Sequence, residues 1–129
     1  MPLLLALKDR SEVVTVRAQA AESLGNLLGC GHPRTRRYRK AERWLIYALC
    51  DPAPEIRFWS AFALGTMRSY RALPRLEVLA AVDTAVCPGW WTVQDEATDA
   101  IECIITGEWP EIERQRLEFV PVEALGTTC

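Results

Sequence analysis

Residues 54–65 read PEIRFWSAFALG. Ile56, Ala63, Leu64 and Met67 recur at about three- and four-residue spacing, which predicts a helix with one apolar face. Forty positions earlier, residues 16–25 (VRAQAAESLG) align with residues 56–65, and a weaker copy (VQDEATDAIE) occupies residues 93–102. Self-similarity at a period near 40 is the sequence signature of stacked helical repeats. The chain is therefore predicted to be all-α, a short α-solenoid.

Glycine and proline residues predict where the helices end. The series 29–33 (GCGHP) and 51–54 (DPAP) are strong stop and turn signals, and no segment shows the period-two alternation of a half-buried strand. We expect one domain with repeats at about 2–31, 34–69 and 70–107, followed by a C-terminal cap or tail at 108–129. The predicted helices cover residues 2–8, 11 or 12 to 28, 34–50, 54–68, 72–82, 90–106 and 110–117.

Bulk composition fits a folded domain. The chain has 129 residues, of which 50% are hydrophobic, enough for one core. No apolar run approaches the length of a spanning helix, and the apolar start is interrupted at residues 8–10, so we expect a cytoplasmic protein with no membrane contact. Five scattered cysteines and the lone His32 predict neither a metal site nor disulfides, and no cofactor is expected.

Three spacings suggest a family. Most of residues 3–106 follows one pattern: Leu-x-x-x-Leu-x-Asp, then Val/Ile-Arg, then Ala-x-x-Leu-Gly. This pattern resembles HEAT-like repeats, of the type also found in phycobilisome lyases. The resemblance implies that the turn aspartate and the arginine after the valine hydrogen-bond along the stack. Gln94 stands where that arginine is expected in the third repeat. The implied set is Asp9, Asp51, Asp83, Arg17 and Arg57.

The repeat register predicts a partner-binding surface. If the positions of Val16/Ile56/Val93 and Leu24/Leu64/Ile101 are buried, two other positions of each second helix line the inner, concave face. An aromatic centre with a charged rim has the composition of an interaction hot spot. The predicted surface consists of Trp59 and Phe62 with Phe58 beside them, and of Gln19, Glu22, Asp95, Glu96 and Asp99. The alternative is that the tail folds back through Trp109, Leu117 or Phe119 and covers this face.

A second candidate surface is basic, with Glu42 as its only acidic member: Arg34, Arg36, Arg37, Arg39, Lys40 and Arg43. It suits an acidic protein face or the acidic tail of a neighbouring copy, because residues 1–79 are net basic and residues 95–129 net acidic. Opposite charges at the two ends also suggest a homo-oligomer. Nucleic acid is a weaker alternative, although Trp91 and Asp95 faintly resemble the pair used by HEAT-like alkylation-repair glycosylases. An acidic concave face would repel phosphates.

The sequence holds no catalytic signature. No nucleophile elbow, P-loop, HExxH or dinucleotide-binding motif is present, and His32 lies in a glycine-proline turn without an evident catalytic partner. We therefore expect a non-catalytic protein-binding module with another protein as partner: an adaptor, an assembly factor or an inhibitor of the immunity type. The alternative implied by the resemblance is a lyase or chaperone subunit of the phycobilisome-lyase type, acting with a partner subunit. Nucleic-acid binding through residues 34–43 ranks third.

Overall fold

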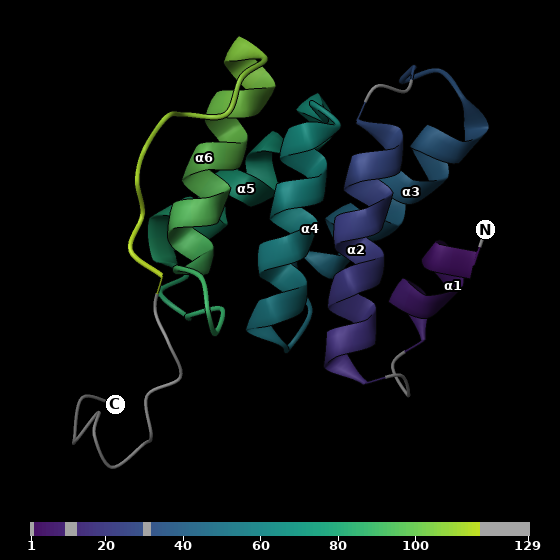
Figure 1. Cartoon of the computed structure of the whole chain (residues 1–129). Coiled ribbons are helices and arrows are strands. Elements are labelled where there is room, and N and C mark those ends of the chain that lie inside the picture. The colour runs from purple at the N-terminus through teal and green to yellow at the C-terminus, as the bar shows by residue number, and fades with distance from the viewer. Residues whose placement is uncertain (1, 10–12, 30–31, 117–129) are drawn as a thin grey trace.

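The computed structural model describes residues 2–9, 13–29 and 32–116 (Figure 1). Within these ranges the chain is all-α, with no strand, as predicted. An isolated bridge pairs Val86 with Thr92. The elements are α1 (Pro2–Lys8), α2 (Val14–Leu28), α3 (Arg36–Ala48), α4 (Pro54–Thr66), the 3-10 turn η1 (Tyr70–Ala72), α5 (Leu73–Val82) and α6 (Val93–Thr106).

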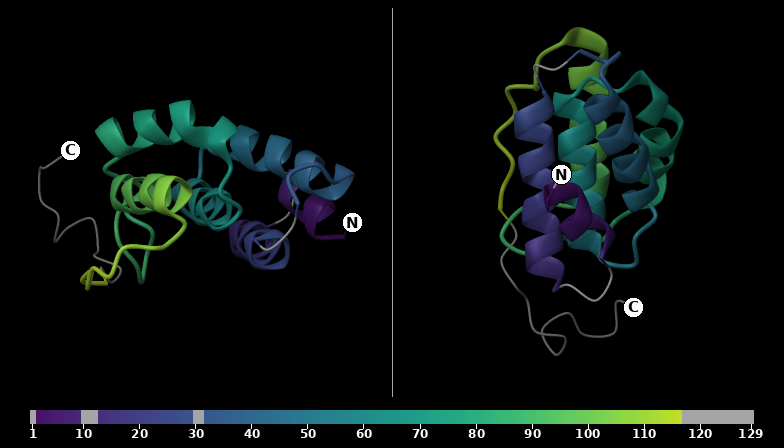
Figure 2. Two further views of the ribbon diagram at one scale, coloured as in Figure 1. Left: turned by 90° about the horizontal axis from the view of Figure 1, so that it is seen from above. Right: turned by 90° about the vertical axis from the view of Figure 1, so that its right-hand side faces the viewer.

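The helices form two layers. Seen from above, α3 and α5 lie in one layer and α2, α4 and α6 in the other, with α1 at the end beside α2 (Figure 2). The pairs α1/α2, α3/α4 and α5/α6 stack side by side, and α4 packs between α2 and α6. This arrangement is a short α-solenoid, in which each pair buries its apolar face against its neighbours.

Glycines at equivalent positions let the second helices approach closely. A Cβ atom added at Gly25 would lie 2.6 Å from Ala63 Cα, and one added at Gly65 would lie 2.9 Å from Ala100 Cα. Both distances are below any real contact of a Cβ atom with backbone, so only glycine fits. Glycine inside a helix lowers the stability of that helix, and this close helix contact explains why glycine recurs at the position.

The buried register differs from the prediction at two positions. Leu24, Ile56, Leu64 and Val93 are fully buried as expected, but Val16 is 38% exposed and Ile101 is only partly buried. These two residues belong to α2 and α6, which have a neighbour in their own layer on one side only. Helix α4 has one on both sides, so its apolar residues are covered more completely.

Several helix ends also differ. Helix α2 begins at Val14, after the expected Ser11 or Glu12, which lie outside the described residues. Helix α3 begins at Arg36, not Arg34, because Thr35 Oγ1 accepts a hydrogen bond from Tyr38 N (3.2 Å) and caps it.

The last two predicted helices differ more strongly. Helix α6 begins at Val93, not Trp90, because Thr92 caps it by accepting a bond from Asp95 N (3.1 Å). The helix expected at 110–117 does not form: residues 109–116 carry no regular secondary structure, and Leu117 lies outside the described residues. Arg114 and Arg116 instead reach back to α6 and to the loop before it.

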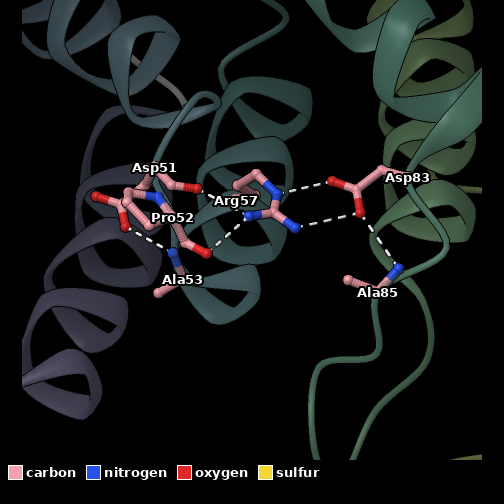
Figure 3. Close-up of polar contacts among 6 residues, drawn as sticks. All are labelled: Asp51, Pro52, Ala53, Arg57, Asp83 and Ala85. Carbon is pink, nitrogen blue, oxygen red and sulfur yellow. Dashed lines mark hydrogen bonds and ion pairs between the residues drawn. The ribbon is translucent and has the colours of Figure 1, made fainter. Parts of the chain in front are cut away.

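The arginine–aspartate ladder implied by the resemblance is present between adjacent repeats. Arg57 Nε and Nη2 donate to the carboxylate of Asp83 (2.7 and 3.3 Å), and Arg57 Nη1 donates to the carbonyls of Asp51 and Pro52 (2.8 and 3.1 Å) (Figure 3). Arg17 forms the equivalent ion pair with Asp51, which is buried. Each arginine thus ties the second helix of one pair to the turn of the next.

The ladder changes at the third pair. Gln94, in the arginine position, donates from Nε2 to the carbonyl of Ala81 (3.2 Å), and its backbone N–H donates to the carbonyl of Asp83 (2.8 Å). A neutral amide therefore joins α6 to the end of α5 within the same pair. Two of the implied aspartates, Asp51 and Asp83, hold an arginine of the preceding pair.

Gly25→Ala tests the close contact of α2 with α4. We expect the free energy of unfolding to fall by about 1–3 kcal/mol, because the new methyl group would collide with the backbone of Ala63. Urea unfolding of both proteins measures the change. Asn26→Ala, at the exposed neighbouring position of the same helix, is the control and should be neutral or slightly stabilising. A Gly25→Ala protein as stable as the wild type would contradict the contact.

Arg17→Met tests the buried part of the ladder. The side chains of Arg17 and Asp51 are 7% and 2% exposed, so the substitution removes a buried cation that faces a buried carboxylate. We expect a loss of about 3–5 kcal/mol in chemical unfolding. Arg17→Met/Asp51→Asn should recover part of that loss, since the amide keeps the acceptor for Ala53 N (2.9 Å) without the charge. A double variant less stable than Arg17→Met would argue against a charge effect.

Candidate functional site

The predicted partner-binding residues belong to α2, α4 and α6, and those that keep exposed surface mark the outer side of this layer. We call this side the B face. Gln19 on α2 is exposed, and Glu22, Trp59, Phe62 and Asp95 are half-buried. Three predicted members are buried instead: Phe58, Glu96 and Asp99.

The prediction that Phe58 belongs to the partner-binding surface is wrong, because a side chain that is 0% exposed cannot contact a partner. Trp59 and Phe58 are adjacent on α4 and therefore point in different directions. Phe58 enters a second, smaller core with Cys87 and Val93, whereas Trp59 packs against both cores and keeps part of its surface on the B face.

Six aromatic side chains form a continuous group that we call the ring cluster. Trp59 makes edge contacts with Phe58, Phe62 and Trp90 at ring-centroid distances of 5.2, 5.4 and 5.2 Å. Edge-to-face pairs at these distances stabilise beyond their buried area. The cluster joins α4 to the loop before α6 and to the segment after it. Its members are Phe58, Trp59, Phe62, Trp90, Trp91 and Trp109.

A tight loop places Trp90 and Trp91. Gly89 has a φ of +82°, which a glycine adopts without strain, and turns the chain after Pro88. The hydrogen bonds from Cys87 N to Trp91 O (3.0 Å) and from Trp90 N to Cys87 O (2.9 Å) close the turn. Both rings therefore contact Phe58, which two adjacent residues of a helix could not do. The Pro88-Gly89 turn is visible in the sequence, but the helix predicted to begin directly after it, at Trp90, begins at Val93.

The segment after α6 returns along that helix. Gly107 (φ +88°) ends α6, and residues 108–116, which we call the strap, then run antiparallel to it on its outer side (Figures 1 and 2). Trp109 stacks on Phe62, with ring centroids 5.5 Å apart and planes at 17°. Its ring edge occupies the notch that Gly65 leaves open, where an added Cβ would lie 2.7 Å from Trp109 Cη2.

Two arginines of the strap contact the face beside the ring cluster. Arg114 Nε and Nη2 donate to the two carboxylate oxygens of Asp99 (2.7 and 2.6 Å), and Arg114 Nη1 lies 3.4 Å from Asp95 Oδ1. The guanidinium of Arg116 lies over the ring of Trp90, 4.4 Å from its centroid. A bidentate arginine–carboxylate pair and a cation–π contact are both specific in geometry.

The alternative in which the tail covers the predicted surface is therefore correct for Trp109. Leu117 and Phe119, its other expected members, lie outside the described residues. Sequence reasoning missed Arg114 and Arg116. The available signal was a tryptophan followed at five- and seven-residue spacing by arginines in an otherwise acidic segment.

Glu96 is the most strongly perturbed carboxyl of this region. It is 4% exposed, and Trp91 Nε1 donates to its Oε1 (3.4 Å). Burial raises the pKa of Glu96 from 4.5 to about 7; repulsion from Asp99 adds to the shift, while the bond from Trp91 and the charge of Arg114 oppose it. At neutral pH this carboxyl thus holds a proton in a large fraction of molecules.

Glu96→Gln tests this titration. The folded state keeps the proton of Glu96 up to about pH 7, whereas the unfolded state releases it near pH 4.5, so raising the pH favours unfolding. Relative to Glu96→Gln, we expect the wild type to lose up to about 3 kcal/mol of stability between these pH values and no more above them. Urea unfolding from pH 4 to 8 measures this. Parallel curves for the two proteins would contradict the shift.

The predicted basic surface lies mainly on the other layer. All six of its members are exposed on the first turns of α3 and the residues before it. The fold adds Arg71, which lines a hollow of about 390 Å³ together with Arg39, Arg43, Glu42 and Ile46. Glu42 is buried: Ser69 Oγ donates to one of its carboxylate oxygens (2.6 Å), and Arg71 Nη1 lies 3.9 Å from the other. The basic surface as a whole stays on the layer of α3. The basic surface and the acidic part of the B face therefore point in different directions.

No catalytic constellation stands out in the described part of the chain. Among the residues that the structure describes, no group of three or more histidine, cysteine, aspartate or glutamate side chains could hold a metal ion. His32 is exposed, and Trp91 and Asp95 are engaged by Glu96 and Arg114. None of the described helices is long and apolar enough to cross a membrane.

The stacked helix pairs, the glycine contacts and the arginine–aspartate ladder define a helical-repeat protein of the α-solenoid class. The family model of HEAT repeats matches residues 1–87, which is two thirds of the chain, and the chain belongs to this family. The match concerns HEAT repeats in general and does not extend to the phycobilisome lyases. Searches of curated proteins and of solved structures found no match.

Proposed function

We propose that this chain is a non-catalytic protein-binding module that takes a partner protein on the B face and serves as an adaptor, assembly factor or inhibitor. HEAT repeats commonly mediate protein–protein interaction, and solenoids use the face lined by their second helices for this purpose. The observation that carries the proposal is the half-buried aromatic pair Trp59 and Phe62 on the B face, flanked by Glu22 on α2 and Asp95 on α6.

The arrangement suits protein recognition on physical grounds. Aromatic side chains held rigidly by their neighbours contribute contact area without losing rotamer entropy on binding. Carboxylates at the rim favour basic partners and steer their approach. The two cores fix the position of this surface, because Trp59 packs against both of them and its ring contacts the fully buried Phe58.

Charge reversal on α2 tests the proposal without disturbing the cores. We expect Gln19→Arg/Glu22→Arg to reduce capture of the native partner at least about tenfold, since it inverts the charge of the accessible B face beside Trp59. Capture by the tagged full chain from its native host, quantified by mass spectrometry, measures this. Trp59→Ala is less suitable, because its ring packs against both cores and its loss would also lower stability.

The matched control is Arg37→Glu/Lys40→Glu on the basic surface of α3, where both side chains are exposed. A partner that this control retains and the α2 variant loses would support binding on the B face. A partner lost only in the control would move the interaction to the basic surface and overturn the proposal.

A further inference from the structure

We infer that the part of the B face over α4 and α6 is a site for an extended peptide segment of the partner protein, with an aromatic side chain and, five residues later, an arginine. This inference deepens the proposed function and rests on it. The strap of the chain itself occupies the site and shows which chemistry fits there. A partner segment of this kind displaces the strap.

The site has two anchor positions on rigid helices. The first is the notch at Gly65, walled by Phe62, where Trp109 inserts. The second is the carboxylate pair Asp95 and Asp99, which grips the Arg114 guanidinium. Five extended residues span at most about 17 Å, so the separation of the anchors selects the spacing of the two side chains in the ligand.

The strap is held in a way that makes it replaceable. Within residues 109–116, the backbone makes no hydrogen bond with any other described residue. Besides the two anchors, Arg116 contacts Trp90, and at the start of the strap Glu108 N and O are hydrogen-bonded to Thr106 Oγ1 (3.2 and 3.1 Å). The side chains of Glu111, Ile112, Glu113 and Gln115 are exposed. Because residues 109–116 have few buried contacts and no backbone hydrogen bonds to the described residues, this part of the strap opens at low cost.

Charge complementarity argues for a partner segment with an arginine. The remainder of the strap is acidic, with glutamates at 108, 111 and 113 that are repelled by the anchor carboxylates Asp95 and Asp99. A ligand with the same two anchors and without these glutamates would avoid that repulsion. Lysine would fit less well, because the two oxygens of Asp99 receive two parallel N–H donors.

A competition experiment on the full chain tests the inference. The probe is a fluorescein-labelled peptide of residues 107–116, GEWPEIERQR, followed by fluorescence anisotropy. In Trp109→Ala/Arg114→Glu the strap loses both anchors, and we expect the peptide to bind at least about tenfold more tightly than to the wild type, whose strap competes at high local concentration. Arg114→Glu alone is the second variant, should the first fold poorly by circular dichroism.

The matched control is Ile112→Ala/Gln115→Glu, which makes the same kinds of change at exposed strap positions and should bind the peptide as weakly as the wild type. A peptide with alanine for its tryptophan and glutamate for its first arginine should bind none of the proteins. Equal binding of the two peptides, or no gain in the anchor variants, would overturn the inference. So would a wild-type dimer that exchanges straps, seen by light scattering, because the occupant would then be a second copy.

The inference and the proposed function fail separately. Gln19→Arg/Glu22→Arg lies on α2, outside the two anchors. If that variant loses the native partner while the peptide binds no anchor variant, the B-face function stands and the assigned ligand is wrong. If the peptide binds but capture is unchanged in the α2 variant, the peptide site stands and the wider B-face function is wrong.

Discussion

Helix α4 can pack between α2 and α6 only because glycine occupies one position of each close contact. At Gly25 and Gly65 an added side-chain carbon would overlap the backbone of the adjacent helix. The same absence of a side chain at Gly65 opens the notch that receives Trp109. One backbone constraint therefore fixes both the spacing of the solenoid and the shape of its candidate binding surface, which explains how the middle repeat carries fold and site together.

The arginine–aspartate ladder aligns successive helix pairs with one another. Arg17 and Arg57 each reach forward to the aspartate of the following turn, so the pairs stack in one register. The free energy of such buried pairs is small in net terms, because desolvation offsets the attraction, but breaking one is costly. We infer that the ladder sets the register in which the helix pairs stack, whereas the apolar contacts of α4 are the main source of stability.

Much of the fold followed from residues whose roles are local or repeated. The 40-residue echo between positions 16–25 and 56–65 located α2 and α4, and the resemblance to HEAT-like repeats implied the ladder at Asp51 and Asp83. The site was harder to predict from the sequence, because its main contacts join segments that do not follow the 40-residue repeat. Nothing local to Trp109 indicates that it will stack on Phe62, and the apolar and charged pattern of 110–117 favours a helix that the attraction of Arg114 to Asp99 overrides. Phe58 is adjacent to Trp59 in the sequence but points into the smaller core, because neighbouring residues of a helix face different directions.

The proposed peptide site requires the strap to lie on the B face, and a double-mutant cycle tests that contact most directly. Asp99→Asn, Arg114→Gln and the double variant would be unfolded in urea alongside the wild type. The bidentate pair, largely shielded from water at Asp99, predicts a coupling energy of about 1–2 kcal/mol. Additive effects, with a coupling energy indistinguishable from zero, would show that Arg114 does not hold the strap to α6 and would contradict the account.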